Sequence, residues 1–119
     1  MSQPVIQRHN VVTRYSDAAV YQGVVYLAGM VPECEATDIS SQTTDVLAQI
    51  DRTLAACGSD KTRLLRVQIF LADIRDIAAM NAVWNAWVPS GNAPPRATVQ
   101  AALADPSWRI EVVATAAQV

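Results

Sequence analysis

The first strong pattern of apolar and polar positions lies between Ser40 and Gly58. Apolar residues recur there every three or four positions, which is typical of one face of an α-helix. The stripe consists of Val46, Leu47, Ile50, Leu54 and Cys57. Ser40 or Ser41 can cap the first turn, and Gly58 suits the left-handed residue that follows a helix. We therefore predict a helix that packs this stripe against a core.

A second helix is predicted after Asp73, whose side chain can cap its first turn. Its apolar stripe consists of Ile77, Met80, Trp84, Trp87 and Val88. Pro89 and the turn-forming residues 90–92 end it. Tryptophans at helical spacing belong to a core more often than to a ligand site, so we assign both of them to the core.

The remaining apolar runs predict six strands, at residues 4–12, 18–21, 24–28, 66–71, 96–101 and 109–116. Gln22 and Gly23 separate the second run from the third and indicate a hairpin turn. No linker or internal repeat interrupts the chain, so we expect one domain over residues 1–119. The order of strands and helices predicts an α+β fold, with two helices on one face of a mixed, largely antiparallel sheet.

Composition adds an expectation about assembly. Hydrophobic residues make up 51% of the sequence and charged residues 17%, below the roughly 25% charged residues of a typical soluble domain. Two helices can cover only one face of the sheet, and this composition does not suit an opposite face exposed to water. We expect a neighbouring copy to cover that face, which makes the protein a homo-oligomer.

Several kinds of partner are disfavoured by the sequence. A net charge of -2 provides no field that would attract nucleic acid or an anionic membrane. No apolar run approaches the roughly 18 residues of a membrane span, and we expect a cytoplasmic protein. Cys34 and Cys57 lack metal-ligand spacing, so we expect reduced thiols that are structural or incidental, and no metal site. His9 has no second ligand or nucleophile at a useful spacing.

Candidate chemistry is concentrated in residues 94–111, which contain Arg96, Thr98 and Glu111. If the last two strands pair antiparallel about residues 102–107, Thr98 lies opposite Glu111 and all three side chains share one face. A carboxylate within an apolar strand is costly unless it is paired or hydrogen-bonded. Two interpretations follow: a structural Arg96–Glu111 ion pair, or a site in which the arginine binds a substrate carboxylate and the glutamate orients water.

Short motifs along the whole chain support the second interpretation. They are Tyr26-Leu27-Ala28-Gly29, Gln42-Thr43, residues 54–58, residues 67–73, Met80-Asn81, Pro95-Arg96-Ala97-Thr98-Val99 and Ile110-Glu111-Val112. With these motifs, in this order and without large gaps, the chain resembles the YjgF/Rid (reactive intermediate deaminase) family.

The resemblance implies a chorismate-mutase-like α+β domain assembled as a homotrimer, with clefts between subunits. Members with the arginine hydrolyse enamines and imines such as 2-aminoacrylate to 2-keto acids and ammonia, and no metal or organic cofactor is used. By resemblance, Arg96 binds the substrate carboxylate, Glu111 binds water, and Thr98 stands where many members have cysteine or serine. Tyr15, Asn81 and the backbone N–H of Gly29 match further cleft positions.

Two departures from the family bear on the substrate. The frequent Ser-Gly-Gln is Ala28-Gly29-Met30 here, which removes a hydroxyl group from the cleft, and Arg14 adds a cation beside Tyr15. The alternative function is a non-catalytic protein that binds small carboxylates such as 2-keto acids. RNA cleavage, an activity reported around the family, is disfavoured by the net charge of -2 and the lone His9.

Overall fold

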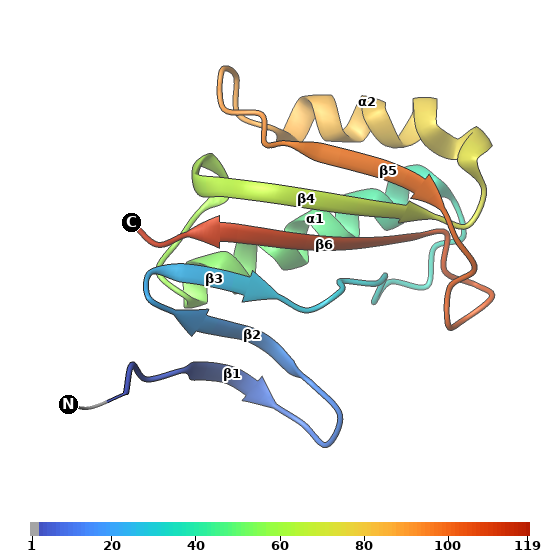
Figure 1. Cartoon of the computed structure of the whole chain (residues 1–119). Coiled ribbons are helices and arrows are strands. Elements are labelled where there is room, and N and C mark those ends of the chain that lie inside the picture. Colours follow the sequence, from blue (N-terminus) through green and yellow to red (C-terminus); the bar gives the residue numbers. More distant parts are fainter. Residues whose placement is uncertain (1–2) are drawn as a thin grey trace.

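One mixed sheet with both helices on the same face organises the chain (Figure 1). The computed structural model describes residues 3–119. Its strands are β1 (Gln7–Val11), β2 (Ser16–Tyr21), β3 (Val24–Leu27), β4 (Leu64–Leu71), β5 (Arg96–Gln100) and β6 (Ile110–Ala117). Its helices are α1 (Ile39–Ala56) and α2 (Ile77–Trp87), with the short 3₁₀ turns η1 (Lys61–Arg63) and η2 (Ile74–Asp76). None of the helices described is long and apolar enough to span a bilayer.

The strand order is β1-β2-β3-β6-β4-β5, and only β4 and β5 run parallel. Helix α2 is a crossover between these two strands, and a crossover returns the chain parallel to its starting strand. β6 then inserts antiparallel between β3 and β4. The predicted pairing of the last two strands is therefore wrong, because β4 separates β5 from β6.

The connection between β5 and β6 crosses the end of β4 instead of forming a hairpin. The Ala101 N–H donates to the Leu71 carbonyl at 2.9 Å, and the Ala72 N–H donates to the Arg109 carbonyl at 3.0 Å. Residues 101–109 thus begin on one side of β4 and finish on the other. The short interval between the last two strands in the sequence is compatible with either arrangement.

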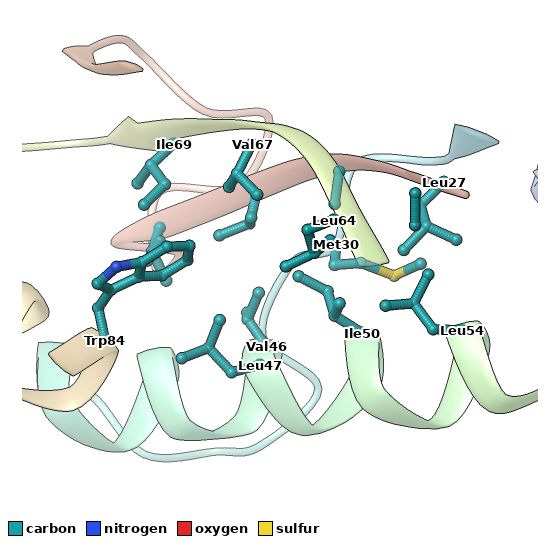
Figure 2. Close-up of a cluster of buried hydrophobic side chains, with 14 of the residues drawn as sticks. Leu27, Met30, Val46, Leu47, Ile50, Leu54, Leu64, Val67, Ile69 and Trp84 are labelled. Atoms are coloured by element: carbon teal, nitrogen blue, oxygen red, sulfur yellow. The ribbon is translucent and has the colours of Figure 1, made fainter. Parts of the chain in front are cut away.

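The hydrophobic core lies between the sheet and the helices, as the two stripes predict. Helix α1 contributes Val46, Leu47, Ile50 and Leu54, which face side chains of β3 and β4 such as Leu27, Val67 and Ile69 (Figure 2). Met80 and Trp84 of α2 are buried in the same cluster. Trp87 packs against it, and its indole N–H donates to Asp51 of α1 at 2.9 Å. The assignment of both tryptophans to the core is confirmed.

Two helix starts differ from the prediction. The N-cap of α1 is Asp38 rather than Ser40 or Ser41, and its carboxylate accepts from the Ser41 N–H at 2.9 Å. This hydrogen bond lowers the pKa of Asp38. Asp73 caps η2 instead of α2, which begins four residues later without a side-chain cap. Aspartate is as good an N-cap as serine, so the sequence alone did not decide between neighbouring caps.

The predicted left-handed positions are confirmed. Gly58 follows α1 with φ +75°. Gln22 and Gly23, with φ of 48° and 80°, form the hairpin turn between β2 and β3, and positive φ at both central residues is what a type I′ turn requires.

The sheet face away from the helices carries exposed and partly buried apolar side chains, interspersed with polar ones such as Gln68 and Thr115. Tyr26 of β3 is 50% exposed and Val99 of β5 is 44% exposed. Phe70 and Val113 on β4 and β6 are partly buried on the same face. This is the uncovered face expected from the composition, and an assembly that buries it remains a prediction.

Candidate functional site

The sheet register divides the expected site residues between two faces. Arg96 lies beside Val67 and Thr98 beside Ile69, both of which are buried under the helices. Glu111 lies opposite Phe70, on the other face. Because laterally paired residues share a face, Arg96 and Thr98 point to the helix side and Glu111 to the open side. The predicted convergence of all three side chains within one chain is wrong, and so is a structural ion pair between Arg96 and Glu111 in that chain.

On the open face, Glu111 lies in a cleft of about 660 Å³ that Tyr15 and Gly29 also line. A two-way backbone contact builds this arrangement: the Met30 N–H donates to Val112 at 2.8 Å, and the Val112 N–H donates to Met30 at 3.0 Å. That contact brings Gly29 alongside Glu111. A Cβ atom at Gly29 would lie 3.0 Å from the Glu111 carboxyl carbon, so only glycine leaves the carboxylate in place.

The Glu111 carboxylate is unpaired within residues 3–119. It accepts no hydrogen bond from that part of the chain, and the ion pairs found there are Arg52–Glu33, Arg75–Asp73 and Arg109–Asp76. Glu111 is only partly exposed, and a partly buried carboxylate without a partner is destabilising. Its hydrogen-bonding capacity is therefore free for water or a ligand.

Arg96 and Thr98 lie on the helix side, at the β5 edge of the sheet, and Asn81 lies on the helix α2 that packs there. The Arg96 guanidinium carbon lies 5.1 Å from the centre of the Trp84 ring, a cation–π contact. Within residues 3–119 Arg96 has no carboxylate partner. Helix α2, which carries Asn81 and Trp84, runs back along β5 (Figure 1).

Two buried polar atoms on α2 and β5 lack partners. Neither Asn81 Oδ1 nor Thr98 Oγ1 has a hydrogen bond within residues 3–119, although both atoms are buried. Buried polar atoms are almost always hydrogen-bonded in folded proteins. Asn81 and Thr98 can therefore still form hydrogen bonds with a ligand, water or another copy, as Glu111 can on the opposite face.

An adjoining hollow of about 340 Å³, which shares Asp17, Met30, Glu33 and Gln49 with the Glu111 cleft, contains His9, together with Asn10, Arg52 and Thr53. Its polar groups largely satisfy one another. Asn10 donates to Asp17 at 3.0 Å, and Arg52 lies 3.9 Å from Glu33. Across residues 3–119 no three metal-ligating side chains gather closely enough to hold an ion. His9 therefore lies outside the Glu111 cleft.

Several residues that line the cleft were not among the candidates. They include Met30, Val31, Pro32, Ala104 and Trp108. Trp108 was detectable in the sequence as the aromatic residue three positions before Glu111, but an expected hairpin connection gave it no role. Of the two departures from the family, Ala28 lines the cleft, whereas Arg14 is exposed and is not among the lining residues.

Comparison with known proteins agrees with this architecture. A family model described as endoribonuclease L-PSP matches residues 5–118. A RutC family protein of Haemophilus ducreyi is 45% identical over 113 residues, which cover 95% of this chain and 97% of that protein. A more distant relative, the 2-iminobutanoate/2-iminopropanoate deaminase of Rattus norvegicus, is 27% identical over 110 residues, covering 87% of this chain and 80% of the rat protein.

The fold has close counterparts among solved structures. The crystal structure of a YjgF family member from Neisseria meningitidis superposes with a TM-score of 0.95 at 49% identity, covering 97% of this chain and 96% of that one. Likeness of sequence and fold thus extends over nearly the entire chain, including both strands that carry Arg96 and Glu111. The chain belongs to the YjgF/Rid family, whose family model is described as endoribonuclease L-PSP.

Proposed function

We propose that the protein is an enamine/imine deaminase that hydrolyses 2-imino acids of the 2-aminoacrylate type to 2-keto acids and ammonia. The main support for the proposal is that the sheet separates two unpaired charged side chains. Arg96 and Glu111 lie on opposite faces of one sheet, and neither has a partner of opposite charge within residues 3–119. A site that uses both groups therefore needs two copies of the chain. We infer a homotrimer in which the Arg96 edge of one copy closes the Glu111 cleft of the next.

Charge in the cleft supports this arrangement. Asp17, Glu33 and Glu111 line it, and its lining contains no lysine or arginine. Arg52 of the adjoining hollow lies 3.9 Å from Glu33, so the cleft lining itself offers a substrate carboxylate no free cation, and we infer that this cation comes from a second copy. Arg96 suits this role because its planar guanidinium binds a carboxylate through two parallel hydrogen bonds.

The uncovered sheet face supports the contact between copies. Tyr26, Phe70, Val99 and Val113 present apolar surface there. Removing apolar surface from water contributes roughly 25 cal/mol per Å². A second copy placed on this face would bury that surface and bring a neighbour's Arg96 edge near the cleft.

In the proposed reaction, the carboxylate of the imine binds Arg96, with Thr98 and Asn81 donating or accepting hydrogen bonds beside it. The C=N carbon then lies over a water molecule held by Glu111. Glu111 takes a proton from the water as its oxygen bonds to that carbon, and returns this proton to the nitrogen, which gives a tetrahedral adduct with a hydroxyl and an amino group. Glu111 then takes the hydroxyl proton and passes it to the amino nitrogen as the C–N bond breaks, which releases ammonia and leaves the 2-keto acid.

Such a site needs few catalytic groups, because imines already hydrolyse spontaneously in water. Positioning the water and one acid–base group account for an acceleration of roughly 10²–10⁴. The Gly29 N–H, which has no backbone acceptor within residues 3–119, is available as a further donor at the cleft. The mechanism forms no covalent bond between the protein and the substrate.

The direct test follows 2-keto acid formation from freshly generated 2-aminoacrylate. We expect Arg96→Ala and Glu111→Gln each to lower kcat/KM by about 100-fold, since each removes one essential function. Arg63→Ala, which removes an exposed arginine of η1 that lines neither hollow, should retain wild-type activity. Equal rates for wild type and Arg96→Ala would refute the proposal.

The alternative function is binding of small carboxylates without turnover, in the same cleft. A 2-keto acid would then raise the melting temperature, while imine hydrolysis would stay at its spontaneous rate. RNA cleavage is disfavoured by the acidic lining, because phosphate binding depends on cationic side chains.

A further inference from the structure

Trp108 forms part of the cleft wall close to Glu111. It lies three residues before the glutamate, on the connection between β5 and β6, and its side chain is partly buried. The reaction proposed above gives this indole no role, because it neither binds the carboxylate nor moves a proton. It can, however, contact whatever side chain the substrate carries.

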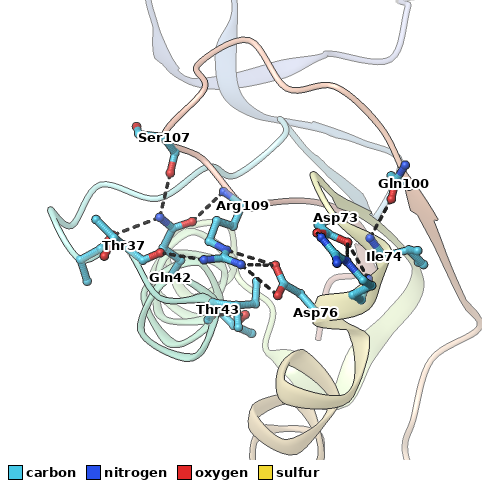
Figure 3. Close-up of polar contacts among 12 residues, drawn as sticks. Thr37, Gln42, Thr43, Asp73, Ile74, Asp76, Gln100, Ser107 and Arg109 are labelled. Atoms are coloured by element: carbon cyan, nitrogen blue, oxygen red, sulfur yellow. Dashed lines mark hydrogen bonds and ion pairs between the residues drawn. The ribbon is translucent and has the colours of Figure 1, made fainter.

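The backbone on both sides of Trp108 is held by one buried amide. Gln42 of α1 is 2% exposed. Its Nε2 donates to the Ser107 carbonyl at 3.0 Å, and its Oε1 accepts from the Arg109 N–H at 2.7 Å (Figure 3). The Gln42 side chain therefore fixes the backbone immediately before and after Trp108. This anchors the Trp108 backbone to helix α1.

Further contacts hold the same connection. The Arg109 guanidinium donates to the two carboxylate oxygens of Asp76 at 3.0 and 3.1 Å (Figure 3). Asp105 accepts from the hydroxyl and the N–H of Ser107 at 2.6 and 2.8 Å, and these hydrogen bonds lower the pKa of Asp105. Trp108 is thus presented by an ordered loop, and ordering that precedes binding reduces its entropic cost.

The size and chemistry of the cleft indicate what the indole contacts. A volume of about 660 Å³ lies within the roughly 300–1,000 Å³ typical of sites for drug-sized ligands. Around Glu111 the wall residues Met30, Val31, Pro32, Ala104 and Trp108 are apolar. The single methylene of 2-aminoacrylate would leave most of this wall without a contact, whereas a branched or aromatic side chain would cover it.

We propose that Trp108 is a specificity-determining residue, which makes the protein prefer 2-imino acids with bulky apolar side chains over the three-carbon imine. This inference rests on the proposed deaminase function and names its substrate class. Trp108 stabilises the bound substrate by apolar contact, while Glu111 and the neighbouring copy's Arg96 act on groups that all 2-imino acids share.

The test compares imines formed in situ from alanine, leucine and phenylalanine by an amino-acid oxidase. We expect wild-type kcat/KM to be higher for the phenylalanine and leucine imines than for the alanine imine. Trp108→Ala should lower the phenylalanine-to-alanine ratio of kcat/KM by about tenfold, mainly through KM, since apolar pockets discriminate by about that much. Trp108→Phe should restore most of the ratio. Leu103→Ala, on the same connection but outside the cleft lining, should keep the wild-type ratio.

The outcomes separate this inference from the deaminase proposal. Turnover of all three imines with an unchanged ratio in Trp108→Ala overturns the role of Trp108 and leaves the deaminase proposal intact.

If wild type hydrolyses no imine, the deaminase proposal fails. Calorimetric binding of phenylpyruvate and pyruvate then tests the apolar wall of the cleft directly. Tighter binding of phenylpyruvate that is lost in Trp108→Ala would support the apolar wall. Equal affinity for both acids, or a preference that survives the substitution, would overturn it.

Discussion

Gly29 is the residue on which the position of Glu111 depends most directly. In Gly29→Ala the new Cβ would lie 3.0 Å from the carboxyl carbon and 3.3 Å from Cγ of Glu111, so the glutamate side chain has to move. Gly29 is exposed and is not among the residues with positive φ, so the backbone tolerates alanine. We expect kcat/KM to fall by about 100-fold, as in Glu111→Gln, with a change in unfolding free energy within about 1 kcal/mol. Steady-state kinetics and urea unfolding measure the two effects.

A double-mutant cycle identifies the cause of that loss. If Gly29→Ala acts by displacing Glu111, adding it to Glu111→Gln should cost little further activity, because the carboxylate is already gone. Additive losses would show that Gly29 acts through another group, such as its backbone N–H. Wild-type activity in Gly29→Ala would show that the observed placement of Glu111 is not needed for turnover.

Local sequence drew attention to some of the candidate residues, whereas Tyr15 and Asn81 became candidates only through the family resemblance. Glu111 is a carboxylate between apolar neighbours, and Gly29 stands where a strand ends. Which residues meet in space was not predictable in the same way, because it depends on strand order. Trp108 was visible in the sequence as an aromatic residue near Glu111, but its place in the cleft wall depends on how residues 101–109 cross β4, which the sequence did not reveal.

Among the secondary-structure elements, η2 provides a test of acid dependence. Hydrogen bonds from the side chain and backbone of Arg75 lower the pKa of Asp73 from 3.8 to about 2. The stabilisation linked to this shift is fully present above the unfolded-state pKa near 4 and is lost as the pH falls through the folded value near 2. Arg75 is 88% exposed, so solvent screens the pair and the effect is small.

We expect Asp73→Asn to be slightly less stable than wild type at pH 6, with the difference shrinking as the pH is lowered from 4 to 2. Urea unfolding at several pH values measures this difference. Glu35→Gln removes an exposed carboxylate that has no hydrogen bond within residues 3–119 and should follow the wild-type pH dependence. A stability gap for Asp73→Asn that stays constant down to pH 2 would contradict the role of the Arg75 contact.

Both helices could be predicted from the sequence because their evidence is local. The stripes of α1 and α2 repeat within a few residues, and the core uses them as the periodicity indicates. The strand that pairs with β5 could not be predicted from local sequence. That pairing depends on α2 acting as a crossover that returns the chain parallel to β4. A short connection before β6 suggested a hairpin, yet residues 101–109 reach across β4.

At the scale of the whole molecule, the proposed trimer would explain both the separation of Arg96 from Glu111 and the apolar side chains on the open sheet face. When a surface of one copy binds a different surface of the next, the contacts close into a ring if the rotation allows it. The Arg96 edge and the Glu111 cleft are two such different surfaces. A closed ring of three copies would contain three equivalent sites, and a single copy would contain none.

Subunit mixing tests this assembly without any structure of the oligomer. Arg96→Ala and Glu111→Gln should each be nearly inactive alone, but equal amounts unfolded and refolded together should regain about a quarter of wild-type activity. Each site needs an intact arginine from one copy and an intact glutamate from its neighbour, and each requirement is met with a probability of about one half. Refolding either variant alone should give no recovery, and neither should mixing the folded proteins if subunit exchange is slow. A co-refolded mixture that stays inactive, although wild type recovers fully under the same protocol, would show that Arg96 and Glu111 do not serve one site across a subunit contact.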